Sequence, residues 1–137
     1  MITDAGGVPL TLLTTPANVP DGKVAIGLLD AIPAVAGSRG RPRFRPDVFQ
    51  GDAGYGWQIN IDETKARGIQ PQLARPRAQA HGSGLGQTRY VVERTLSWFP
   101  HYRRLRHCFE KCGEHFQAFH ELVAALICHK KWIAFHV

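Results

Sequence analysis

Apolar and polar residues change their spacing several times along the chain, and each change predicts a new element. Val, Leu and Thr are dense in residues 8–15, which is typical of a strand. Apolar residues at helical spacing follow in residues 21–35. Short apolar runs at 48–51 and 69–73 predict two further strands, separated by a helix at 56–67. The alternation of strand and helix predicts an α/β chain with a mixed sheet.

Glycine, proline and aspartate mark the ends of these elements. Asp4-Ala5-Gly6-Gly7 predicts a hairpin turn between a strand that ends at residue 4 and the strand 8–15. Asp21 is the expected N-cap of the helix 21–35, which Pro33 would end or kink early. Gly68 is expected to stop the helix 56–67.

The C-terminal half predicts two helices after a flexible linker. The linker is expected at residues 74–88, where glycine, serine and arginine gather. A long helix then begins near Arg89, and Pro100 bends it or splits it in two. Gly113 separates it from a final helix at 114–131. The expected apolar stripes are Val92, Thr95, Leu96, Phe99, Leu105 and Phe109 in the first helix, and Phe116, Phe119, Val123, Leu126 and Ile127 in the second.

Composition and net charge indicate which class of partner the chain binds. The chain has 137 residues, which suits one domain or a large part of one, and 17 Lys+Arg against 11 Asp+Glu give a net charge of +6. This balance favours a polyanion such as nucleic acid, although a merely basic surface is the alternative. Three cysteines argue against a disulfide framework, and no apolar run reaches the roughly 18 residues of a membrane span. With no signal peptide, we expect a cytoplasmic protein without membrane contact.

Two isolated carboxylates are the candidate catalytic residues. Asp52 follows the strand 48–51, and the carboxyl ends of strands are where function gathers in α/β sheets. Glu93 is expected in the opening turn of the long helix, 41 positions later. Carboxylates from separate elements can hold the two Mg²⁺ ions that activate a nucleophile and stabilise a leaving oxyanion. The alternatives are a turn cap for Asp52 and compensation of the helix dipole for Glu93.

Histidines and cysteines between residues 107 and 115 suggest a second kind of metal site, for zinc, on weaker grounds. His107, Cys108, Cys112 and His115 could hold zinc, but two cysteines four apart on a helix share one face. Buried thiols that continue the apolar stripe are the preferred interpretation. Alternating arginines from Arg39 to Arg45 predict an extended basic loop and a second nucleic-acid contact.

Several segments resemble bacterial insertion-sequence transposases with a DDE catalytic domain. Residues 90–99, Tyr-Val-Val-Glu-Arg-Thr-Leu-Ser-Trp-Phe, and Tyr102-Arg103-Arg104-Leu105-Arg106 resemble the signature around the last catalytic acid. Gly51-Asp52-Ala53-Gly54-Tyr55 resembles the segment of the middle acid. Residues 4–10 and 15–21 resemble the hairpin and helix entry between the first and middle acids. The resemblance covers nearly all of the chain.

The resemblance implies a ribonuclease-H-like fold with a C-terminal pair of helices, and Asp52 and Glu93 as ligands of Mg²⁺ or Mn²⁺. Gly86 and Pro100 depart from the signature, which usually has tyrosine and lysine there. The first catalytic aspartate would precede residue 1, because Asp4 stands at the hairpin turn. Residues 1–137 are therefore expected to be a partial catalytic domain. The residues expected to contact DNA phosphates are Arg89, Arg94, Arg103, Arg104, Arg106 and Lys111.

By the same resemblance, the function would be DNA transposition, with cleavage at element ends and strand transfer into target DNA. The chain would be inactive alone and would need an upstream portion, as a frameshift partner or a decayed copy. Its partners would be transposon ends, target DNA, an upstream-frame transposase product or a second copy, in the nucleoid of a bacterial cytoplasm. The alternative is a non-catalytic DNA-binding or regulatory fragment of a decayed transposase.

Overall fold

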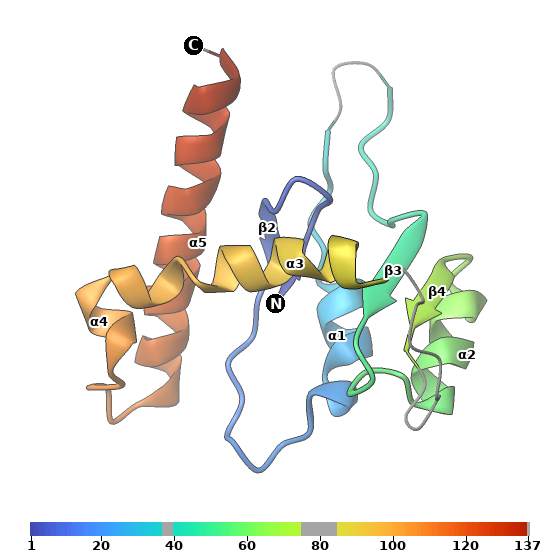
Figure 1. Ribbon diagram of the computed structural model, residues 1–137, viewed down its shortest axis with the longest axis horizontal. Coiled ribbons are helices and arrows are strands. Elements are labelled where there is room, and N and C mark those ends of the chain that lie inside the picture. Colours follow the sequence, from blue (N-terminus) through green and yellow to red (C-terminus); the bar gives the residue numbers. More distant parts are fainter. Residues whose placement is uncertain (37–39, 75–84, 137) are drawn as a thin grey trace. The chain divides into compact units, whose positions relative to one another are not determined.

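Two compact units make up the chain in the computed structural model (Figure 1). Unit 1 comprises Met1–Thr15 and Tyr90–Val137, and unit 2 comprises Pro16–Arg89. The structure describes residues 1–36, 40–74 and 85–136, and for residues 85–89 and 136 it describes the backbone alone. Arg39, Arg75, Arg77 and most of the predicted linker therefore lie outside the described residues.

The elements follow the predicted alternation of strand and helix, with a split where Pro100 stands. In chain order they are β1 (Ile2–Thr3), β2 (Pro9–Thr11), η1 (Asp21–Lys23), α1 (Ala25–Asp30), β3 (Val48–Gly51), α2 (Gln58–Ala66), β4 (Gln70–Leu73), α3 (Leu85–Leu96), η2 (Phe99–His101), α4 (Arg103–Arg106) and α5 (Gly113–His136). The prediction of a chain that mixes helices and strands is confirmed.

The hairpin of unit 1 forms where the adjacent glycines predicted it. β1 and β2 pair antiparallel, and Asp4 closes the turn by accepting the backbone N–H of Gly7 at its carbonyl (3.0 Å). The Asp4 Oδ1 accepts the N–H of Val8 at 2.7 Å. Gly7 has φ of 79°, a conformation that glycine adopts without steric cost. The carboxylate of Asp4 thus satisfies one local backbone donor, and its carbonyl satisfies another.

β2 ends at Thr11 rather than Thr15, because a helix side chain replaces the next strand as its partner. Gln117 of α5 donates Nε2–H to the carbonyl of Leu12 (3.1 Å), and its Oε1 accepts from Thr14 N (2.7 Å) and Thr14 Oγ1 (2.9 Å). A side-chain amide offers a donor and an acceptor in one plane, as a neighbouring strand does. The backbone carbonyl of Leu12 and the backbone N–H of Thr14 therefore have hydrogen-bond partners without further strand pairing.

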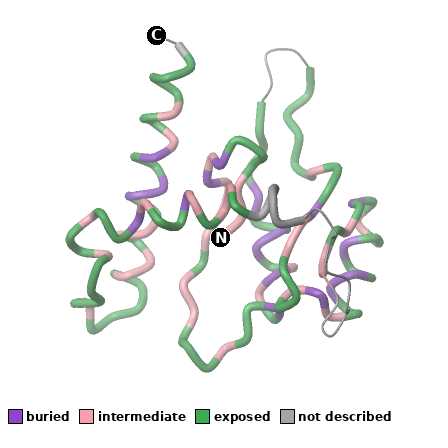
Figure 2. Tube along the Cα trace, in the orientation of Figure 1, coloured by how far each residue is buried: buried purple, intermediate pink, exposed green. Residues whose placement is uncertain are grey.

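The core of unit 1 lies between α5 and η2. Its buried residues are Phe99, Val123, Ala124 and Ile127, with Met1, Leu12, Trp98, Tyr102 and Leu105 packed around them. The burial of one narrow stripe of α5 is visible in Figure 2. Leu126, expected to point inward, is 40% exposed, because it lies about 100° around the helix from Ile127.

Pro100 splits the predicted long helix. α3 ends at Leu96, the proline lies in the first turn of η2, and α4 ends at Arg106. The backbone of His107 is extended (φ −132°, ψ 138°), so the residues after it leave the helix. Phe109 is consequently 62% exposed instead of buried. α4 and α5 contact each other and form the C-terminal helical pair.

The prediction of buried thiols is wrong. Cys108 and Cys112 are both exposed and lie between α4 and α5, outside either helix. The apolar spacing that suggested a shared face depended on a continuous helix through residue 112, and that helix ends at Arg106.

Unit 2 contains a parallel pair of strands connected by a helix. β3 and β4 pair in register from Val48↔Gln70 to Gly51↔Leu73, and α2 makes the crossover between them. Gly68 ends α2 as predicted: it has φ of 72°, and its N–H donates to the carbonyl of Lys65 at 2.8 Å. The buried hydrophobic residues of unit 2 are Ala25, Leu28, Leu29, Ile32, Phe49, Ile61 and Ile69.

The helix predicted at 21–35 is shorter and is capped differently. Asp21 lies inside η1, and the N-cap position is Pro20, which has no side-chain oxygen to offer, so the N-cap prediction is wrong. α1 ends at Asp30, because a residue before proline is disfavoured in the helical region and Pro33 lies close downstream.

The strands form two separate sheets in the part of the chain that the structure describes. β1–β2 is antiparallel in unit 1, and β3–β4 is parallel in unit 2, so no single mixed sheet joins the four. α3 begins at Leu85, four residues before the predicted start, and so takes residues 85–88 from the predicted linker.

Candidate functional site

Asp52 lies immediately after β3, as the sequence predicted, on the exposed surface of unit 2. Its Oδ1 accepts the backbone N–H of Gly54 at 2.9 Å, and its carbonyl accepts the N–H of Tyr55 at 3.2 Å. These two bonds define a local turn in which an aspartate replaces a backbone acceptor. Among the described residues Oδ2 of this exposed side chain has no hydrogen-bond or ion-pair partner, so the turn engages only one of the two carboxylate oxygens.

The turn that carries Asp52 is held by a buried amide. Asn60 of α2 is 3% exposed, and its Nδ2 donates to the carbonyl of Gly22 (2.9 Å) and to the carbonyl of Tyr55 (3.0 Å). A Cβ on Gly22 would stand 2.8 Å from the carbonyl oxygen of Gly54, so only glycine fits there. Asn60 thus ties η1 to the backbone that follows Asp52.

The hydroxyl of Tyr55 is half-buried in unit 2, near two carboxylates. Burial raises the pKa of the Tyr55 hydroxyl, and the nearby carboxylates of Asp21 and Asp52 raise it further. The hydroxyl therefore stays protonated near neutral pH.

Glu93 lies in the second half of α3, on the exposed surface of unit 1. The prediction that it occupies the first turn of its helix is wrong, because α3 begins at Leu85. Near the C-terminal end of a helix a carboxylate opposes the macrodipole rather than compensating it. No hydrogen bond or ion pair of its carboxylate occurs among the described residues. Compensation of the helix dipole therefore does not explain a glutamate at this position.

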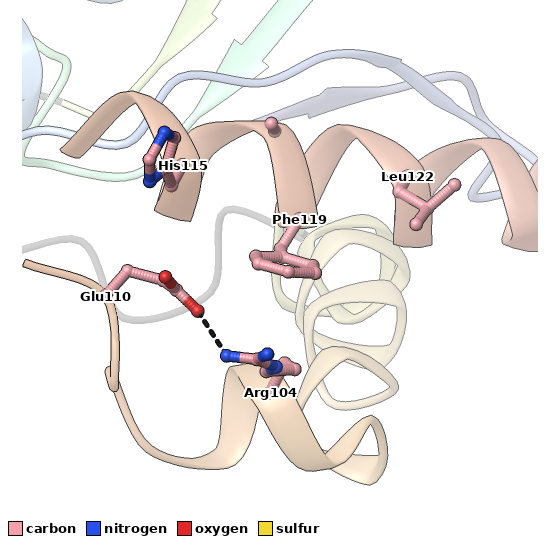
Figure 3. Close-up of a pocket in the computed structure, with 6 residues that line it drawn as sticks. Arg104, Glu110, His115, Phe119 and Leu122 are labelled. Carbon is pink, nitrogen blue, oxygen red and sulfur yellow. Dashed lines mark hydrogen bonds and ion pairs between the residues drawn. The ribbon is translucent and has the colours of Figure 1, made fainter. Parts of the chain in front are cut away.

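The predicted phosphate-contacting residues of α4 are exposed, and one of them already has a partner. Arg103 and Arg106 are exposed. Arg104 donates to Oε1 of Glu110 at 2.7 Å, and its guanidinium lies 5.2 Å from the ring centroid of Phe119 (Figure 3). Glu110 neutralises part of the charge of Arg104, which makes Arg103 and Arg106 the freer cations of this helix.

The remaining predicted basic residues differ in their surroundings. The guanidinium carbon of Arg94 lies 5.7 Å from the ring centroid of Tyr90, and its buried Nε finds no hydrogen-bond partner among the residues that the structure describes. Lys111 is exposed. The side chain of Arg89 lies outside the described residues. Arg94 is therefore packed into unit 1 and exposes only part of its charge.

Sequence reasoning missed two lysines of α5. The ammonium of Lys130 lies 5.8 Å from the ring centroid of Tyr102, and that of Lys131 lies 5.4 Å from the ring centroid of Trp98. Each of these cations therefore lies beside an aromatic ring of unit 1. No local signal reveals this, because α5 and those aromatic residues meet only in the tertiary structure. Phe99, in contrast, is 5% exposed and belongs to the core, as predicted.

No preformed metal cluster occurs in the described parts of either unit. Within residues 1–36, 40–74 and 85–136, no group of three or more His, Cys, Asp or Glu side chains is gathered closely enough to hold a metal ion. Asp52 belongs to unit 2 and Glu93 to unit 1. No helix in these same ranges is both long and apolar enough to cross a membrane.

Comparison with known proteins identifies the family. The family described as "Transposase DDE domain" matches residues 1–128. A putative transposase for the insertion sequence element IS402 of Burkholderia cepacia is 45% identical over 128 residues, which cover 93% of this chain and 60% of that relative. The chain thus spans about three fifths of the relative's length. No solved structure matches the chain. The chain therefore belongs to the transposase DDE-domain family.

Proposed function

We propose that this chain is the part of an insertion-sequence transposase that supplies two acids, Asp52 and Glu93, to metal-dependent DNA cleavage and strand transfer. Family membership and the likeness to the transposase of IS402 support DNA transposition as the process. The proposed fold is ribonuclease-H-like, completed by an upstream portion that adds the first aspartate. The alternation of strands and helices is compatible with that completion.

The observation that carries the proposal is the placement of Glu93. Its carboxylate is exposed, opposes the dipole of α3, and has no cation partner in the described part of the chain. An unpaired acid near a helix C-terminus costs about 0.3–1 kcal/mol at low salt. A functional ligand explains why an acid occupies a position where it opposes the helix dipole and pairs with no cation among the described residues.

The donor atoms fit Mg²⁺ or Mn²⁺. Both ions prefer oxygen ligands, and Mg²⁺ is usually bound by one or two carboxylates, several waters and substrate phosphates. Oδ2 of Asp52 and the carboxylate of Glu93 are the available oxygens, and the turn that engages Oδ1 of Asp52 holds that side chain in place. When bound, such an ion lowers the pKa of a nucleophilic water or hydroxyl and stabilises the leaving oxygen. The protein's own part is to hold these oxygens in fixed directions.

Basic side chains of unit 1 would bind the DNA backbone. Arg103, Arg106 and Lys111 are exposed, and Lys130 and Lys131 lie beside Tyr102 and Trp98. Phosphate contacts of this kind position a duplex without reading its sequence. Oligomerisation and nucleoid association belong to the same proposal.

A joining assay on the transposase completed with its upstream portion tests the two acids. Labelled element ends, target DNA and Mg²⁺ or Mn²⁺ are incubated with Asp52→Asn or Glu93→Gln, and cleavage and joining are measured beside DNA binding. Both variants should lose joining while binding stays within a few-fold. The matched controls are Asp62→Asn and Glu114→Gln, which change exposed acids of α2 and α5. Joining by Glu93→Gln at the rate of its control would reject the assignment.

One observation favours a second candidate function, a non-catalytic DNA-binding or regulatory fragment. Oδ1 of Asp52 forms a local turn, which is a structural role that an aspartate plays without any metal. The net charge of +6 would still bind DNA. In this case the isolated chain binds labelled DNA with a steep salt dependence, and the unmutated chain neither cleaves nor joins DNA even when it is completed with its upstream portion.

A further inference from the structure

Thr95 lies two residues after Glu93, and its side chain is fully buried against the hairpin turn of unit 1. Its hydroxyl donates to the carbonyl of Gly7 at 2.9 Å, and it also lies 3.1 Å from the carbonyl of Val91 in the preceding turn of α3. Thr95 has no exposed surface. The bond to Gly7 joins residues 88 positions apart, so it fixes α3 against the turn rather than stabilising the helix locally.

Gly7 fits α3 only because it has no side chain. A Cβ at this position would lie 2.8 Å from Oγ1 of Thr95 and 3.2 Å from Cγ1 of Val91, and the first distance is shorter than real contacts allow. The φ of 79° is itself strained for any residue with a Cβ. The turn and the helix therefore fit each other closely at Gly7. A side chain at this position would disturb both the turn and α3.

The same turn is also held by α5. Nζ of Lys131 hydrogen-bonds the carbonyl of Gly6, and Sγ of Cys128 lies 3.5 Å from the carbonyl of Pro9. Thr95 and Lys131 thus bind adjacent carbonyl groups of one turn from two different helices. The turn has little freedom to follow α3 if that helix rotates.

The burial of Thr95 decides where Glu93 points. Successive residues of a helix are rotated by about 100°, so residues two apart point about 200° from each other. With Thr95 facing the turn, Glu93 faces away from it, in agreement with its exposed side chain. We propose that Thr95 and Gly7 form a lock that sets the rotation of α3 and makes Thr95 the positioning residue for the carboxylate of Glu93. This inference rests on the proposed role of Glu93 as a metal ligand.

Paramagnetic NMR on the transposase completed with its upstream portion tests the lock. Mn²⁺ is titrated into isotope-labelled protein, and broadening of the backbone amides of residues 92–94 reports ion binding at Glu93. Loss of a residue that orients a metal ligand typically weakens metal binding by a factor of 10 to 100, so Thr95→Val should raise the half-broadening Mn²⁺ concentration by about 10-fold. Thr95→Ser, which keeps the hydroxyl, should restore the wild-type titration.

A matched control separates positioning from the general cost of losing a buried hydroxyl. Thr64 is equally buried, and its hydroxyl donates to the carbonyl of Asn60 at 2.6 Å within unit 2. Thr64→Val should therefore leave broadening at residues 92–94 unchanged. If Thr95→Val titrates like the wild type, or if Thr95→Ser weakens binding as much as Thr95→Val, the lock is overturned.

Failure of the metal assignment gives a different result. Glu93→Gln should abolish the broadening, and if it does not, Glu93 binds no metal and the proposed function fails at this residue. Hydrogen exchange then decides the lock by itself. Gly7→Ala should accelerate exchange of the α3 amides, because its Cβ would displace Thr95. Unchanged exchange in that variant contradicts the lock.

Discussion

Replacement of Asn60 by alanine should destabilise the turn that carries Asp52. Asn60 is buried and donates both of its amide hydrogens, to Gly22 at 2.9 Å and to Tyr55 at 3.0 Å. Each bond contributes about 1 kcal/mol, and the carbonyl of the buried Gly22 left without a donor adds about 1 kcal/mol or more. The higher helix propensity of alanine returns up to about 0.7 kcal/mol. The expected net loss is about 2–3 kcal/mol.

Hydrogen exchange measures this loss within unit 2 alone. A loss of 2–3 kcal/mol corresponds to roughly 30- to 150-fold faster exchange of the protected α2 amides, at a factor of ten for each 1.4 kcal/mol. Gln58→Ala is the matched control on the same helix, because the Gln58 side chain only makes an exposed bond to Asp62 (2.8 Å). Its effect should stay within about 0.5 kcal/mol.

Acceleration of exchange by less than about threefold in Asn60→Ala, or by no more than in the control, would show that Asn60 does not hold the turn of Asp52. A small effect would mean that Gly22 and Tyr55 find other donors, so the amide is not what ties η1 to the turn. A large effect confined to α2, with unchanged exchange in α5, would support the two bonds of Asn60 as a clamp that acts within unit 2.

Two further predictions concern titratable groups. The hydrogen bond from Arg67 holds the pKa of Asp30 below its ordinary value, so this pair stabilises unit 2 above the unfolded-state pKa, and the stabilisation is lost as pH falls through the lower folded-state pKa. Arg67→Met should return the NMR titration of Asp30 to the ordinary range, and an unmoved midpoint would contradict the pairing. Burial raises the pKa of the Cys128 thiol, whereas Cys108 and Cys112 are exposed. Brief alkylation followed by mass spectrometry should therefore label Cys108 and Cys112 before Cys128, and the reverse order would refute their placement.

Local signals in the sequence were sufficient for several element boundaries. The glycines after Asp4 predicted the hairpin turn, Gly68 predicted the end of α2, and Pro100 predicted the break before α4. Each of these residues restricts or frees its own backbone dihedrals, so its effect is independent of distant contacts. The block around Glu93 likewise predicted the family, because a run of specific side chains is readable without a fold.

Other features depended on contacts that no local pattern encodes. The end of the helix at Arg106 exposed both Cys108 and Cys112, although their spacing suited a buried face. The start of α3 at Leu85 moved Glu93 from the first turn to the second half of its helix, which reversed its relation to the helix dipole.

The sequence by itself therefore determined the order of strands and helices, the turns at Gly7 and Gly68, and membership of the transposase DDE-domain family. Only the tertiary structure decided that strands pair in two separate sheets, that Asn60 clamps the turn of Asp52, and that Thr95 binds Gly7. The physical reason is range: dihedral preferences act within a few residues, whereas a buried donor finds its acceptor across tens of residues, at a place that packing alone selects.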